Sequence, residues 1–208
     1  MNFVKKQAFL AWKFYREQLL RLHLGCMLAF LAVCALSAVV LGLFAEQAQA
    51  IVESFMAEVQ QSGLVDKNGS ISLAALFGNN LQATLTATVM GFVPFVFLPV
   101  FSLALNGAVI GAVLALSGMM GLQLWQMIFL GLLPHGIFEI PAIMLGVAMG
   151  LYLCRQMNGT LCKRPGTPKI EAVLPHLCRV AVFGVVSLLA AAAVIETCVT
   201  PLLLGLAL

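Results

Sequence analysis

Two glutamates and one histidine stand out because they lie within or beside long apolar segments. Glu139 follows His135 by four residues, and Glu196 lies near the end of the last apolar segment. A charge inside a membrane costs at least about 2.5–3.5 kcal/mol, so such residues normally face the interior of a helix bundle and have partners there. Imidazole and carboxylate groups are ligands of zinc and similar divalent ions. His135, Glu139 and Glu196 are therefore a candidate divalent-metal site.

Other roles for these three residues remain open. Buried His and carboxyl groups can simply hydrogen-bond helices together, and they can also form a proton or ion relay. A second zinc site, from Cys154, Cys162, His176 and Cys178, is compatible with the composition, although its spacing matches no known metal module. The chain contains no HExxH, GxSxG or Walker A motif. We therefore predict that the protein is not an enzyme.

The composition determines what kind of scaffold must hold these residues. Hydrophobic residues make up 62% of the 208 positions and charged residues only 9%, whereas a soluble domain carries about 25% charged residues. Lipid must therefore cover much of the surface, and the long apolar runs favour helices. A net charge of +3 without a basic stripe argues against nucleic acid as a partner. The sequence predicts an all-α membrane protein.

About 20 apolar residues are needed to cross a bilayer, and five segments approach this length. The predicted spans are residues 24–44, 80–103, 107–121, 137–154 and 180–199. Residues 1–23 mix aromatic with basic side chains and predict an amphipathic helix on the inner surface. The segment 45–78 should lie outside and begin with a second amphipathic helix, followed by a turn at 66–70. Residues 122–133 are predicted to be interfacial or re-entrant.

The basic residues predict how the chain is oriented. Ten of the eleven Lys and Arg residues lie in 1–23 or in the predicted loop 155–179, and Lys67 is the eleventh. Five spans with the N-terminus inside place both basic clusters in the cytoplasm, as the positive-inside rule requires. We therefore expect a multi-pass protein of the cytoplasmic membrane.

This topology places several polar residues at one depth. Glu196 lies seventeen residues after Arg179, or about 25 Å along a helix, which puts it near the outer end of its span. His135 and Glu139 begin their span from the outside, as do Asn79 and Asn80. The sequence therefore predicts one polar cluster of five residues near the outer surface.

Small residues predict where helices approach each other closely. Gly146 and Gly150 continue the helix face of His135 and Glu139, and Gly107 and Gly111 form a second small-xxx-small pair. Asn106-Gly107 favours a tight turn, so we place the connection between the second and third spans there. Prolines 94, 99 and 141 should interrupt helical hydrogen bonds, whereas Pro134 suits the start of a helix.

These landmarks together resemble the stage II sporulation protein M family. The segment Pro134–Ala142 (PHGIFEIPA) resembles the family signature, and so do Ile195-Glu196 with Thr200-Pro201, Phe77–Asn80, and Asn106-Gly107 with Gly111. The resemblance implies a small helical membrane protein. It also implies a scaffold role, because the founding member anchors a complex with two cell-wall hydrolases.

Two functional hypotheses follow. The first is a membrane scaffold or assembly protein that binds membrane or cell-wall-hydrolase partners through its outer segment. The alternative is a small-solute or ion permease, compatible with a homo-oligomer, in which the His/Glu set lies on the transport path. A metal site at the polar cluster is compatible with both.

Overall fold

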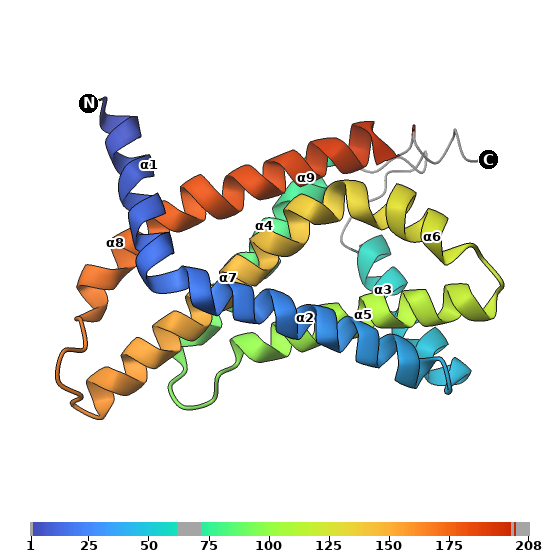
Figure 1. Cartoon of the computed structure of the whole chain (residues 1–208), viewed down its shortest axis with the longest axis horizontal. Helices are drawn as coiled ribbons and strands as arrows, with labels where there is room; N and C mark the ends of the chain where they lie inside the picture. The colour runs from blue at the N-terminus through green and yellow to red at the C-terminus, as the bar shows by residue number, and fades with distance from the viewer. Residues whose placement is uncertain (1, 62–71, 201, 203–208) are drawn as a thin grey trace.

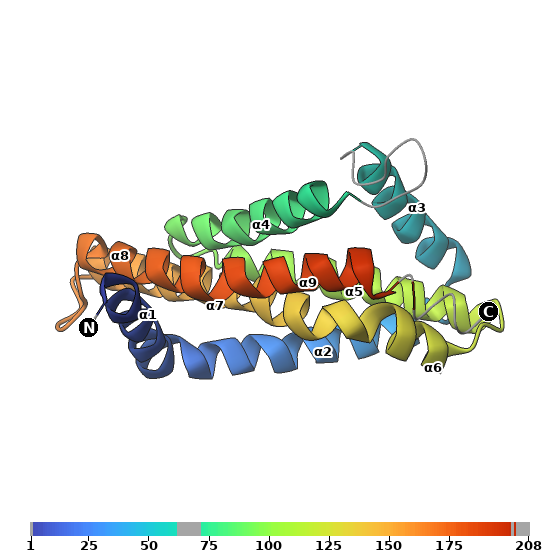
Figure 2. The ribbon, with the colours of Figure 1, turned by 90° about the horizontal axis from the view of Figure 1, so that it is seen from above.

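The computed structural model describes residues 2–61, 72–200 and 202, so the predicted turn at 66–70 and the rest of 62–71 lie outside the described residues. In the part described, the chain is helical and contains no strand. Most of the long helices run roughly along the long axis of the molecule (Figure 1). The start of α1 (Phe3–Phe14) and the loop before α8 (Ile170–Val180) lie at one end of this bundle, and α3 (Ala45–Gln61) and the end of α9 (Ser187–Cys198) lie at the other (Figures 1 and 2). We call these the N-terminal end and the α3 end.

The first half of the chain forms five helices with their connections. The helix α1 (Phe3–Phe14) passes through a π-helical turn at Tyr15–Leu19 into α2 (Leu20–Leu41). The short helix α3 (Ala45–Gln61) follows. After residues 62–71 come α4 (Leu73–Val89), a 3-10 turn at Met90–Phe92 and α5 (Pro99–Met119).

The second half forms two long, interrupted helices. The first comprises α6 (Leu124–Gln126), a π-helical segment at Met127–Leu132 and α7 (Leu133–Leu161). The second comprises α8 (Ile170–Val180), a π-helical segment at Ala181–Val186 and α9 (Ser187–Cys198). Both are continuous through their π segments, so each forms one rod with a local irregularity.

Four helices of the described part are long and apolar enough to cross a membrane. They are Phe3–Leu41, Pro99–Met119, Leu133–Leu161 and Ile170–Cys198. With 17 residues, α4 is shorter than these four, and it packs beside α7 and α9. The prediction of an all-α membrane protein is confirmed.

The predicted helix boundary between spans two and three is wrong. The segment 80–103 is not one helix, because the chain breaks between Phe92 and Pro99 and reverses there. Phe95 and Phe97 have φ angles of 66° and 53°, which few non-glycine residues adopt. Pro94 and Pro99 carry no backbone N–H, so neither could continue a helical hydrogen-bond ladder. The Phe95 N–H donates to Asn158 Oδ1 of α7 at 2.8 Å, which ties the reversal to α7.

The predicted turn at Asn106-Gly107 is wrong for a related reason. Both residues lie inside α5, where the Asn106 side chain donates to the Ser102 carbonyl one turn earlier, at 2.8 Å. Position 107 has room only for a glycine because α2 packs close to it. A Cβ there would lie 2.7 Å from Val33 Cγ1. The Asn-Gly pair therefore serves helix packing here, not chain reversal.

Residues 122–133 are largely helical, as predicted, whereas the predicted loop 155–179 differs from expectation. From Leu124 the chain is already helical and leads directly into α7, so this segment is the bent first part of that helix (Figure 1). The predicted loop 155–179 shrinks to 162–169, because α7 extends to Leu161 and α8 begins at Ile170. The ends of α7 and α8 contain polar residues, so a prediction from hydropathy made both helices too short.

The central helix of the bundle is α7. Nine consecutive residues, Ala142 to Gly150, are buried. One apolar core joins α7 to the start of the chain and to α8 and α9, and a second joins it to α2, α4 and α5. Two of the glycines let backbones touch: a Cβ on Gly146 would lie 2.8 Å from the Thr84 carbonyl oxygen, and one on Gly150 would meet the Ala87 carbonyl.

A buried histidine that the sequence analysis did not single out links α2 to α7. The Tyr15 hydroxyl donates to His23 Nδ1 at 3.0 Å, and His23 Nε2–H donates to the Pro141 carbonyl at 3.0 Å. The neutral imidazole tautomer with its proton on Nε2 satisfies both hydrogen bonds. The signal was a lone His in an apolar segment with a tyrosine eight residues before it, which is too weak a pattern to predict a partner on another helix.

We expect His23→Leu to destabilise the protein by about 1–3 kcal/mol, because the Pro141 carbonyl would be left without this donor in a buried position. Tyr15→Phe removes only a donor to the ring and should cost about 0.5–1.5 kcal/mol. Denaturation in a mild detergent, followed by circular dichroism, measures both. Equal stability of His23→Leu and the unaltered protein would show that this link is dispensable.

Candidate metal centre

The polar cluster is positioned by two irregular helices. Pro134 lies in the first turn of α7, directly after the π-helical segment Met127–Leu132, and Pro141 lies two turns further on. Pro141 cannot donate to the Ile137 carbonyl. Between these prolines, His135 and Glu139 are one turn apart and project from the same face of α7. Short π-helical segments occur frequently at functional sites.

Glu196 approaches this face from α9, which packs against α7. His135 Nε2 lies 3.8 Å from Glu196 Oε2. One ligand atom each from His135, Glu139 and Glu196 lies within 4.8 Å of the others. In the described part of the chain, this is the one group of three or more His, Cys, Asp and Glu residues with such spacing.

A third helix contributes Asn80. Its side chain lies close enough to the Glu139 carboxylate to interact with it. The cluster therefore draws on α4, α7 and α9 at the α3 end of the bundle. A polar side chain that orients a ligating carboxylate is typical of the outer shell of metal sites.

The cluster is largely shielded from solvent. The side chain of His135 is 14% exposed and that of Glu196 is 20% exposed. His135 Nδ1 is buried and has no hydrogen-bond partner among the described residues. A buried polar atom without a partner needs an explanation, and an ordered water or a bound ion is one.

The structure thus brings together four of the five predicted cluster residues. Asn79 is exposed on α4, one residue before Asn80, and none of its described contacts reaches the cluster. The four predicted packing residues, Gly107, Gly111, Gly146 and Gly150, all lie at close contacts between helices.

The cysteine alternative for zinc is not assembled in the described residues. Cys154 is buried in α7, and its Sγ lies 3.4 Å from the Val93 carbonyl. Cys162 and Cys178 are exposed. His176 stacks on the Phe14 ring, with 4.9 Å between ring centroids. Its role is therefore packing between α8 and α1.

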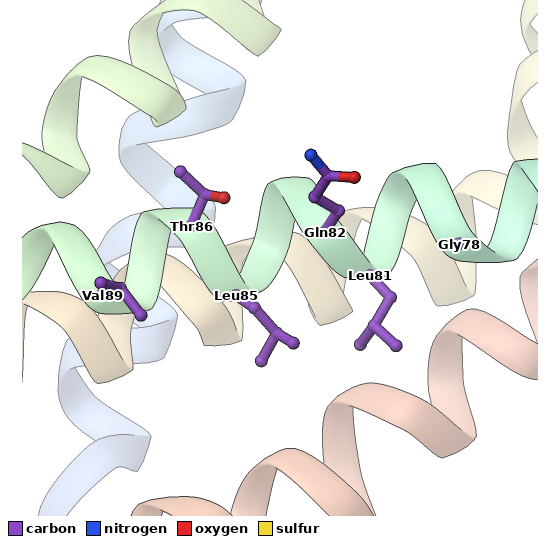
Figure 3. A pocket seen from close by; sticks show the side chains of 6 residues that line it. All are labelled: Gly78, Leu81, Gln82, Leu85, Thr86 and Val89. Carbon is purple, nitrogen blue, oxygen red and sulfur yellow. The ribbon is translucent and has the colours of Figure 1, made fainter. Parts of the chain in front are cut away.

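A shallow groove runs along a different face of α4. Its lining residues are Gly78, Leu81, Gln82, Leu85, Thr86 and Val89 (Figure 3). Leu81 and Leu85 point to one side of the helix, and Gln82 and Thr86 point to the other (Figure 3). No residue of the polar cluster lines this groove, so we do not treat it as part of the site.

The fold and the site define a multi-pass helical membrane protein with a shielded His/Glu cluster near one end of its bundle. The family model of Stage II sporulation protein M matches residues 14–201. The chain belongs to this family, which confirms the resemblance seen in the sequence. No curated protein and no solved structure matches the chain.

Proposed function

We propose that the protein is a non-enzymatic membrane scaffold that binds a partner protein at the α3 end of its bundle. The observation that carries this proposal is the position of α3. This helix extends away from the bundle (Figure 2) and contacts mainly α5. Of its described side chains, only Ala48 is buried.

The surface of α3 has two distinct faces. Ile51, Val52, Phe55 and Met56 follow Ala48 along one side of the helix, and Phe55 and Met56 are 40% and 48% exposed. Glu46 and Glu53 lie on the opposite side. An amphipathic helix whose apolar side is partly exposed is suited to packing against another protein.

The charge of α3 favours a protein partner over the lipid surface. Helices that lie on membranes are typically rich in Lys and Arg on their polar face, which attracts anionic lipids. In contrast, α3 carries three glutamates (Glu46, Glu53 and Glu58) and no basic residue.

The basic residues support an orientation with α3 outside. Both basic clusters belong to the N-terminal end, where α1 contacts α8 and Arg179 Nε donates to Gln7 Oε1 at 2.6 Å. Residues 22–61 and 72–154 contain no Lys or Arg. Applied to the cytoplasmic membrane, the positive-inside rule places the N-terminal end in the cytoplasm. An envelope protein, such as a cell-wall hydrolase or its membrane anchor, is then the class of partner that α3 can reach.

The test is mild purification from native membranes, followed by mass spectrometry of the co-purifying proteins. We expect a stoichiometric partner with the unaltered chain and at least a tenfold loss of it with Phe55→Ser/Met56→Ser, because the apolar contact would be removed. Ala50→Ser/Ala57→Ser, on the exposed opposite side of α3, should keep the partner. Undiminished recovery with Phe55→Ser/Met56→Ser would refute the α3 docking model.

The permease remains the second candidate, favoured by the shielded His/Glu cluster. The buried run Ala142–Gly150 on α7 fills the space between the cluster and the N-terminal end, which supports the scaffold over an open transport path. Flux through proteoliposomes that disappears with both Glu139→Gln and Glu196→Gln would instead support the permease.

A further inference from the structure

We propose that His135, Glu139 and Glu196 bind one divalent transition-metal ion, with zinc the best fit, at the α3 end of the bundle. This goes beyond the scaffold function and does not depend on it. The argument rests on the ligand types, the charge of their surroundings and the unpartnered imidazole nitrogen.

The ligand set is specific to a class of ions. One imidazole with two carboxylates suits zinc and neighbouring transition metals, whereas calcium and magnesium prefer oxygen ligands alone. The donor atoms lie within 4.8 Å of one another. Tetrahedral zinc with bonds of about 2.0–2.1 Å needs ligand atoms about 3.4 Å apart, so small side-chain rotations bring them into range.

The charge balance also favours a divalent cation. Two carboxylates with a neutral imidazole carry a charge of −2, and one divalent ion brings the site to zero. The nearest basic residues along these helices are Arg155 and Arg179, sixteen residues from Glu139 and seventeen from Glu196. These separations correspond to about 24–25 Å of helix. In the low dielectric of a bundle, two carboxylates this close either share a proton or have a nearer positive charge, and a divalent ion supplies that charge.

The surrounding contacts match those of a metal site. The Asn80 side chain lies beside the Glu139 carboxylate, in the position of an outer-shell residue. His135 Nδ1 is buried without a partner among the described residues. His135 Nε2, the ring nitrogen that lies 3.8 Å from Glu196 Oε2, is the one placed for coordination. Three protein ligands leave at least one position of a zinc ion for water.

The test uses the full chain in lipid nanodiscs, with a purification tag that contains no histidine. After removal of bound metal with EDTA, Zn²⁺ binding is measured by equilibrium dialysis and elemental analysis. We expect one equivalent per chain, with affinity at least 100-fold weaker in His135→Ala, Glu139→Gln and Glu196→Gln. Asn80→Leu should weaken binding about 10–100-fold, as outer-shell changes do. Excess Mg²⁺ should not compete.

A matched control and a second measurement distinguish a loss of Zn²⁺ binding from a loss of folding. His176→Ala removes another imidazole whose buried Nδ1 lacks a partner in the described part, and it should keep the full equivalent of Zn²⁺. In parallel, Zn²⁺ should raise the unfolding temperature of the unaltered protein and leave that of Glu196→Gln unchanged. Absence of Zn²⁺ binding in the unaltered protein, or equal binding by all cluster variants, would overturn the proposal.

Discussion

Gly150→Val is expected to prevent assembly of the folded bundle. A Cβ at Gly150 would meet the Ala87 carbonyl oxygen of α4 and would lie 2.7 Å from Pro99 Cγ at the start of α5. From the other side, a Cβ at Gly91 would meet the backbone of Gly150. The end of α4 with the 3-10 turn after it, and the start of α5, therefore both pack directly against α7 at Gly150. Overpacking of a core typically costs about 1–3 kcal/mol, and we expect at least about 3 kcal/mol because part of the obstruction is backbone.

Gly25→Val is the matched control for this prediction. Gly25 lies in α2, and a Cβ there would have no neighbour within 4 Å. Replacing a glycine inside a helix removes a flexible residue and can even stabilise it slightly. Thermal unfolding and size-exclusion chromatography in detergent measure both variants. An unfolding temperature of Gly150→Val equal to that of Gly25→Val would show that the helices are not this close.

Single and combined replacements in the His/Glu cluster should have opposite effects on stability. In metal-free buffer, His135→Leu leaves the Glu139 and Glu196 carboxylates shielded without the imidazole beside them. Removing one member of a buried charged pair typically costs about 3–5 kcal/mol, whereas replacing the whole group with apolar residues is often neutral or stabilising. We therefore expect His135→Leu/Glu139→Leu/Glu196→Leu to be at least as stable as the unaltered protein and to bind no Zn²⁺.

This comparison separates a functional cluster from a purely structural one. If the three polar residues exist only to join α7 to α9, the triple variant should lose at least as much stability as His135→Leu. If they are kept for binding an ion, stability should recover in the triple variant while Zn²⁺ binding is lost. Denaturant titrations of the three proteins in the presence of EDTA give the answer.

The sequence predicted the cluster better than the helices that carry it. His135 and Glu139 share a helix face by spacing alone, and counting residues from Arg179 gave the depth of Glu196. Both inferences need only the regular rise of a helix. Asn80 was included by the same argument, but so was Asn79, because the rotation of α4 about its axis depends on packing that the sequence does not reveal.

Chain reversal between α4 and α5 could not be located from composition. The segment from Val93 to Leu98 is as apolar as the helices around it, and its reversal depends on two phenylalanines with positive φ and on Asn158 from α7. Pro94 and Pro99 were the available signal, whereas Asn106-Gly107 is a common turn sequence that here serves contact with α2. At residues 93–98 and at Asn106-Gly107, contacts with other helices determine the backbone conformation more than the local sequence preference does.

Photo-cross-linking in native membranes tests the scaffold claim most directly. A photoreactive amino acid replaces Phe55 in one chain and Ala57, on the other side of α3, in a second. The account predicts one adduct from position 55, containing this chain and a different envelope protein, and none from position 57. No adduct from position 55, equal adducts from both positions, or an adduct of two copies of this chain would contradict it.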